Sequence, residues 1–186
     1  NQQVHDGFGT KVFNEALTGP EYAAIYEDRC NERDVETWLK SMVVDITPDR
    51  VLTVQSDKGF STIEARSVIF AMGCRERTRG AIGTPGTRPA GVYTAGAVQN
   101  YMNVRNLAVG RKVVILGSGD IGLIMARRLL LEGAEVVCVA EILPQPSGIA
   151  GNIVRCLEDF NIPLYLSTTV AEIHGKERVT GITLAQ

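Results

Sequence analysis

Apolar residues follow two different rhythms in the second half of the chain. The runs 111–116 and 134–140 are rich in β-branched residues and have the length of buried strands. Between them, apolar side chains recur at helical spacing from Leu123 to Glu132, and a second helical stretch covers 149–160. A further apolar run at 162–166 predicts a third strand. Strands that alternate with helices predict a parallel sheet, so we expect an α/β fold.

The first half of the chain predicts a different arrangement. Thr18 and Glu21 have the spacing of a capping box, which predicts a helix from there to about Arg33. Turn residues at 48–50 and 57–59 separate apolar runs and predict an antiparallel meander. The expected strands are a short one at Val35–Leu39, the three of the meander at Ser41–Thr47, Val51–Ser56 and Phe60–Ala65, and a buried one at Ser67–Gly73.

Two further segments complete the predicted order of elements. Residues 79–91 hold four Gly and two Pro with little apolar pattern, which predicts a connector, and a short helix follows around 96–102. After the third parallel strand, 168–173 and 179–185 predict a hairpin around the turn 175–177.

The residues with the clearest chemistry follow the first parallel strand. Gly117, Gly119 and Gly122 have the spacing of a dinucleotide-binding turn, and Glu141 ends the next strand. Gly117 can make the tight turn, Gly119 allows a pyrophosphate to approach the backbone, and Gly122 allows the helix to pack closely on the sheet. The alternative is an ordinary strand–helix–strand unit with glycines at a tight corner.

These residues predict a binding site for NAD(H). The free N–H groups at the start of the helix would face the phosphates, and Glu141 would accept hydrogen bonds from the adenosine ribose. A 2′-phosphate would meet the like charge of Glu141, so NAD(H) is expected rather than NADP(H). An acid at Asp120 repels phosphate, so we expect its side chain to point away and cap backbone. The predicted cofactor-binding residues here are Gly117, Ser118, Gly119, Asp120, Ile121, Gly122 and Glu141.

Composition narrows the class of partner. The 186 residues carry a net charge of −2 and no long block of Lys or Arg, which argues against a nucleic-acid or membrane surface. No apolar run reaches the roughly 20 residues of a membrane span. We therefore expect a small-molecule substrate. For the assembly state, both a homo-oligomer and a complex with a partner subunit remain possible. Four separated cysteines form no Cys-x-x-Cys pair, so we expect no metal site and, with a nucleotide fold, a cytoplasmic protein.

The order of these elements resembles that of the pyridine nucleotide-disulfide oxidoreductase superfamily, in which an FAD domain carries an inserted NAD(P) domain. Ala71, Met72 and Gly73 match the short Ala-x-Gly corner that passes the flavin nucleotide in that family. The segments 73–78 and 91–96 look closest to the branch that contains amine and opine dehydrogenase α-subunits. The resemblance implies two cofactors, FAD and NAD, and hydride transfer between nicotinamide and flavin.

The resemblance also implies a division of the chain. Residues 1–78 would be the back part of an FAD domain, 79–110 a connector, and 111–186 a Rossmann-like three-layer NAD(H)-binding domain, incomplete at its C-terminus. The FAD domain of the family opens with its own glycine motif, which this chain lacks, so we expect a central fragment that is inactive alone. Because the chain has no Cys-x-x-Cys pair, its sequence does not support disulfide reduction as its activity.

Catalytic residues stay unassigned, and three side chains have open roles. Cys74 follows the Ala-x-Gly corner, and the nearby Arg75 and Arg77 would lower the pKa of its thiol, or it is simply a small residue in a tight corner. His174 is expected at the surface, and His5 either at the flavin side or without a role. A non-catalytic nucleotide-binding or subunit-docking scaffold is the competing function, and a methyltransferase-like nucleotide site is a weaker one.

Overall fold

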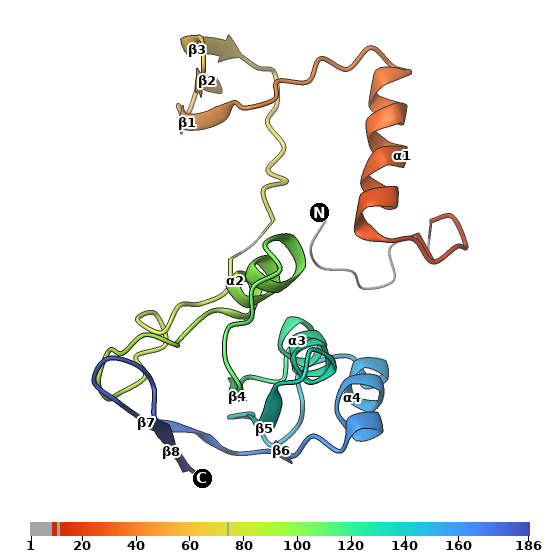
Figure 1. Ribbon diagram of the computed structural model, residues 1–186. Helices are drawn as coiled ribbons and strands as arrows, with labels where there is room; N and C mark the ends of the chain where they lie inside the picture. Colours follow the sequence, from red (N-terminus) through yellow and green to blue (C-terminus); the bar gives the residue numbers. More distant parts are fainter. Residues whose placement is uncertain (1–8, 11, 74) are drawn as a thin grey trace. The chain divides into compact units, whose positions relative to one another are not determined.

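The computed structural model describes residues 9–10, 12–73 and 75–186 (Figure 1). The described residues form two compact units, one up to residue 73 and one from Arg75 to Gln186. Each unit is built from its own elements and is described by itself.

In the first unit, helix α1 spans Gly19–Asn31. The predicted capping box is present: Thr18 Oγ1 accepts from the Glu21 N–H, and Glu21 Oε2 accepts from the Thr18 N–H at 2.8 Å. Each of these bonds satisfies a backbone donor that the helix leaves without a partner. The helix ends two residues before the predicted limit.

The predicted meander is confirmed. It consists of β1 (Met42–Ile46), β2 (Val51–Ser56) and β3 (Gly59–Glu64), which pair antiparallel in the order β1-β2-β3. The β2–β3 turn closes with Ser56 opposite Gly59, and Gly59 has φ 106°, a conformation that suits glycine. Each boundary lies within one residue of the prediction.

The short strand predicted at Val35–Leu39 is wrong. Asp34 and Lys40, directly before and after the segment, both have left-handed φ, at 53° and 52°. The chain therefore turns at both ends, and Trp38 Nε1 instead donates to Glu36 Oε1 at 2.6 Å. Residues that turn at such short intervals cannot form an extended ladder.

The buried strand predicted at Ser67–Gly73 is also wrong. The segment is irregular, and Ile69, Phe70 and Met72 are 88%, 65% and 82% exposed. A strand exists only through hydrogen bonds to a neighbour, and within the described residues no strand pairs with this segment. Its apolar composition is the pattern of a buried strand, but burial depends on contacts that local sequence does not specify.

The second unit contains the predicted parallel sheet. Its strands are β4 (Lys112–Leu116), β5 (Glu135–Ala140) and β6 (Leu164–Tyr165), in the order β4-β5-β6. Both pairings are parallel, which confirms the α/β class. Strand β6 is shorter than predicted because it begins after Pro163, whose nitrogen cannot donate a hydrogen bond. Pro163 still accepts from the Val139 N–H at 2.8 Å.

The helices of this unit are those that the periodicity predicts, with different ends. Helix α2 (Ala95–Gln99) continues into the π-helix η1 (Asn100–Val104), and α3 spans Asp120–Leu131. Helix α4 (Ala150–Cys156) is shorter than expected and is followed by the 3₁₀ turn η2 (Glu158–Phe160). Asn161, with φ 53°, ends this stretch before β6.

The core of the second unit lies around α3. This helix contacts β4, β5, α2 and α4 (Figure 1). Its buried face consists of the apolar residues that the sequence places at helical spacing. Leu123, Met125 and Leu129 are 3% exposed or less, and they pack in one cluster with Val139 of β5 and Leu157. Burying each such side chain contributes about 1.5–3 kcal/mol, so α3 is fixed on the sheet mainly by this cluster.

The predicted connector and hairpin pack together. The hairpin is β7 (Thr169–His174) with β8 (Gly181–Ala185), as predicted. Connector residues form bridges to it, Gly86 with Ile173 and Ala90 with Arg178. Gly86 has φ 100°, and a Cβ there would lie 2.3 Å from the Ile173 carbonyl oxygen, so only glycine allows this approach.

Among the described residues, no helix has both the length and the apolar character that crossing a bilayer requires.

We predict that Thr18→Ala loosens the first turn of α1, because it removes the side-chain acceptor of the capping box. The expected loss is about 1 kcal/mol of local stability, the usual value of such a cap. Hydrogen exchange of the α1 amides measures it. Glu21→Gln keeps an acceptor at the same place and is the control; equal exchange in wild type and Thr18→Ala would contradict the role of the cap.

We predict that Gly122→Ala destabilises the second unit. A Cβ at Gly122 would lie 2.9 Å from the Gly117 carbonyl oxygen and 3.4 Å from Ile115 Cγ2, so α3 would have to move off β4. Overpacking of this kind costs about 1–3 kcal/mol. Thermal unfolding followed by circular dichroism measures the change. Gly119→Ala is the matched control, because nothing lies within 4 Å of a Cβ there.

Candidate functional site

The candidate site lies at the carboxyl ends of the parallel strands β4 and β5. Leu116 pairs with Ala140, and the Gly117 N–H donates to the Ala140 carbonyl at 2.7 Å. The turn that leaves β4 is therefore fixed beside Glu141, the first residue after β5. In open parallel sheets, ligands bind at this end of the strands. The structure brings together the seven residues that the glycine motif predicts.

The three glycines are required for different reasons. Gly117 has φ 101°, which residues with a side chain rarely adopt. Gly122 faces the Gly117 carbonyl and Ile115 so closely that a side chain would collide. Gly119 has φ −66° and ψ 157°, a conformation open to any residue, and nothing lies within 4 Å of a Cβ placed there. Nothing in the described chain requires glycine at 119.

Helix α3 begins at this turn without a side-chain cap. Gly119 occupies the N-cap position, and its carbonyl accepts from the Leu123 N–H at 3.1 Å. The described residues provide no acceptor for the N–H groups of Asp120 and Ile121. Such orphan donors, together with the positive end of the helix dipole, favour an anion.

Glu141 is buried, at 4% exposure, and its carboxylate points to the glycine turn. Oε2 accepts from the Ser118 N–H at 2.9 Å, from Ser118 Oγ at 2.6 Å and from Ser147 Oγ at 3.1 Å. Oε1 accepts from the Leu143 N–H at 2.9 Å. We expected Glu141 to face a ribose directly; in the structure most of its acceptor sites are already used by the chain.

The hydrogen bonds keep Glu141 charged. Burial by itself raises the pKa of this carboxyl, but the donors from Ser118, Leu143 and Ser147 outweigh burial and lower the pKa below its ordinary value. A folded-state pKa below the unfolded value means that the ionised group stabilises the fold fully above the unfolded pKa. This contribution is lost as the pH falls through the lowered pKa.

Asp120 does cap backbone, as expected, but that of a different helix. Its Oδ1 accepts from the Ile149 N–H at 2.9 Å and from Asn152 Nδ2 at 3.0 Å, and Ile149 is the N-cap residue of α4. The carboxylate therefore connects the start of α3 to the start of α4. Ile121, between Asp120 and Gly122, is half-buried in the first turn of α3.

Sequence reasoning missed Ser147. It lies in the loop between β5 and α4, and its N–H donates to Ser118 Oγ at 2.9 Å while its hydroxyl donates to Glu141. Between Pro146 and Gly148 a serine indicates only a turn. No motif spacing could have assigned it to the site.

The other predicted residues belong to other segments of the chain. Ala71, Met72 and Gly73 belong to the first unit, in the exposed irregular segment. His174 is on β7, where Nε2 lies 2.7 Å from Thr183 Oγ1. His5 and Cys74 lie outside the described residues.

Two other side chains have structural roles. Glu76 accepts from the Gly96 N–H at the start of α2. Cys138 is buried, and burial raises the pKa of its thiol. In the part of the chain that the structure describes, no three His, Cys, Asp or Glu side chains gather as metal ligands.

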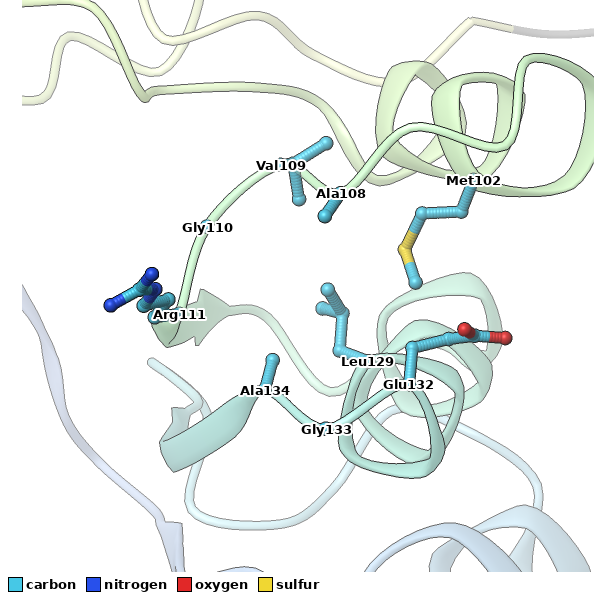
Figure 2. A pocket seen from close by; sticks show the side chains of 9 residues that line it. All are labelled: Met102, Ala108, Val109, Gly110, Arg111, Leu129, Glu132, Gly133 and Ala134. Carbon is cyan, nitrogen blue, oxygen red and sulfur yellow. The ribbon is translucent and has the colours of Figure 1, made fainter.

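A separate hollow lies at the opposite end of the sheet. Figure 2 shows Met102 and Leu129 pointing toward it, with Val109 on its rim. Gly110 and Arg111 precede β4, and Glu132 and Gly133 follow α3, so this hollow is at the amino end of β4. It is distinct from the glycine turn, and its lining is mainly apolar, with Arg111 and Glu132 as its charged residues.

Comparisons with known proteins agree with this geometry. The family described as pyridine nucleotide-disulphide oxidoreductase matches residues 4–186. Human apoptosis-inducing factor 3 is 25% identical over 150 residues, which are 77% of this chain and 24% of that protein. The chain therefore spans about a quarter of the length of this relative.

Solved structures share the fold. The thioredoxin reductase of T. acidophilum has a TM-score of 0.60 at 20% identity over 98% of this chain and 56% of its own. That of Lactococcus lactis has 0.64 at 14% identity, over 98% and 58%. A ferredoxin reductase from Rhodopseudomonas palustris has 0.59 at 22% identity, over 95% and 43%.

The family match covers nearly the whole chain, and the second unit has the glycine turn, the parallel strands and the acid that FAD- and NAD(P)-dependent enzymes of this kind use. This chain belongs to the pyridine nucleotide-disulphide oxidoreductase family.

Proposed function

We propose that the turn 117–122 binds the pyrophosphate of NAD(H) and that Glu141 binds its adenosine ribose. The chain would then serve a flavin-dependent oxidoreductase, in line with its family. The 2′-phosphate of NADP(H) would meet a charged carboxylate, and residues 141–149 contain no Lys or Arg to offset it.

The observation that carries this proposal is Gly119. Its backbone conformation needs no glycine, and its Cβ position is open. The absence of a side chain therefore keeps clear the space in front of the uncapped start of α3. A ligand with negative charge fits that space, because the orphan N–H groups and the helix dipole both favour it.

Glu141 can take part without leaving its place. Each oxygen of an ionised carboxylate has about two acceptor directions. Oε2 receives three donors from the described residues, whereas Oε1 receives one, the Leu143 N–H. The second acceptor direction of Oε1 is left for a ribose hydroxyl. The charged form needed for this is the one that the surrounding donors maintain.

In the whole protein we propose a division of labour between cofactor and chain. When bound, the two cofactors exchange a hydride between the nicotinamide and the flavin, which is chemistry that they supply themselves. The residues of this chain bind, orient and discriminate. No general acid or base is needed from them, and none is assigned.

The FAD part of the proposal rests on resemblance. Residues 1–78 would contribute to an FAD domain, with Ala71, Met72 and Gly73 beside the flavin nucleotide, and 111–186 would form the NAD(H) domain after a connector at 79–110. The segments 73–78 and 91–96 favour the branch of amine and opine dehydrogenase α-subunits. The flavin absorption band of the purified full-length protein is the direct test.

One observation favours a second function, a nucleotide-binding or docking scaffold without turnover. Glu141 is almost fully buried, and its hydrogen bonds to the Ser118 and Leu143 N–H groups are made within the chain itself. A scaffold would keep this arrangement and bind neither NADH nor NADPH.

We predict that Gly119→Ala weakens NADH binding at least tenfold, a loss of about 1.4 kcal/mol, while the fold stays intact. The added methyl group would occupy the space where the pyrophosphate approaches, but it contacts no atom of the chain. Titration followed by nicotinamide fluorescence measures the affinity, and thermal unfolding checks the fold. Gly80→Ala, where the nearest atom to an added Cβ is Thr78 Oγ1 at 4.0 Å, an ordinary contact, is the control. Unchanged affinity in Gly119→Ala would refute the phosphate site.

We predict that Glu141→Gln weakens NADH by about 1–3 kcal/mol, the usual value of a hydrogen bond to a charged group. The preference for NADH over NADPH should fall at the same time, because the repulsion of the 2′-phosphate is removed. The same titration with both nucleotides measures it. Wild-type preference for NADPH, or equal NADH affinity in the variant, would remove Glu141 from the ribose site.

A further inference from the structure

Two serines from different segments bind the same oxygen of Glu141. Ser118 lies in the glycine turn and is fully buried, and Ser147 lies in the loop after β5. Their hydroxyls lie 3.2 Å apart, and both contact Glu141 Oε2, at 2.6 Å for Ser118 and 3.1 Å for Ser147.

The hydrogen-bond donors and acceptors of this cluster can be assigned from its distances. Each hydroxyl has one proton, and the short contact of Ser118 Oγ shows where its proton goes. Ser118 Oγ in turn accepts from the Ser147 N–H at 2.9 Å, and the Ser147 hydroxyl donates to Oε2 at 3.1 Å. With the Ser118 N–H, Oε2 receives three donors, an arrangement that suits only an ionised carboxylate.

We propose that Ser147, together with Ser118, is a positioning residue for cofactor binding: it holds Glu141 ionised with Oε1 directed to the ribose. The proposal rests on the proposed function, since it assigns how the ribose-binding acid of that site is held. Ser147 itself contacts Glu141 and the glycine turn and acts on the cofactor through them.

The loop that carries Ser147 is fixed at its far end as well. The Ile149 N–H donates to Asp120 Oδ1, and Gly148 packs so closely that a Cβ would lie 2.8 Å from the Ser118 carbonyl oxygen. At the near end, the Leu143 N–H donates to Glu141 Oε1. The loop 142–149 therefore holds the Ser147 hydroxyl beside Glu141 Oε2. The carboxylate of Glu141 connects this loop to the glycine turn.

The charge of Glu141 depends on these neutral donors. The titratable side chains of the elements around it include Asp120 at the start of α3, Tyr165 on β6 and Cys138, three residues before it on β5. Within the described residues no Lys, Arg or His forms an ion pair with Glu141. Removal of one hydroxyl donor should therefore shift the titration of Glu141 upward.

The test compares Ser147→Ala with Ser147→Thr in the 186-residue chain. Ser147 is exposed enough to accept the extra methyl group of threonine, which keeps the hydroxyl. We expect Ser147→Ala to weaken NADH binding about three- to tenfold, the effect of one lost hydrogen bond, and Ser147→Thr to restore it. In the free chain, carbon-13 NMR should show the Glu141 carboxyl titrating at a higher pH in Ser147→Ala than in Ser147→Thr.

The outcomes separate this proposal from the proposed function. If wild type binds no NADH, or if Glu141→Gln leaves its affinity unchanged, the ribose site is wrong and this assignment falls with it. If Glu141→Gln weakens binding but Ser147→Ala does not, only the role of Ser147 is overturned. Tighter binding by Ser147→Ala would also overturn it, because the hydroxyl would then compete with the ribose. An unchanged Glu141 titration in Ser147→Ala overturns the claim that the serine holds the charge.

Discussion

The second unit depends on the hydrogen bonds that a buried carboxylate, Glu141, receives from two segments of the chain. A carboxylate at 4% exposure would be costly without partners, and no cation among the described residues pairs with it. The Ser118 and Leu143 N–H groups and two hydroxyls provide the compensation. Removal of any one would leave charge poorly solvated, so the turn after β4 and the loop after β5 have to keep their mutual positions.

The same turn shows how one motif combines folding and binding. The fold itself requires glycine at two positions: at Gly117 because of its positive φ, and at Gly122 because a side chain would collide with a carbonyl oxygen. Neither reason applies at Gly119. A motif defined by spacing alone does not distinguish these reasons, whereas the structure assigns a different one to each position. The chemistry of the family, with nicotinamide and flavin cofactors, is consistent with the position that internal packing leaves unexplained.

Local sequence predicted those elements whose signals are local. These are the Thr18 cap, the turn at Gly59 and the apolar face of α3. Each depends on residues a few positions apart, and the structure confirms all three. The glycine turn and Glu141 were predictable because parallel strands bring their carboxyl ends together. The segment 67–73 was not, because an apolar run becomes a strand only when another strand pairs with it. Ser147 was not either, because its role arises from contacts with Ser118, 29 positions away in sequence.

Strand β6 has a consequence for the behaviour of the chain at high concentration. It forms one edge of the parallel sheet, is two residues long and directly follows a proline. Exposed edges with long rows of free donors recruit other chains and start aggregates. A blunt edge of this kind offers a foreign strand almost no ladder to extend, so the sheet is protected on that side against fibril-like assembly.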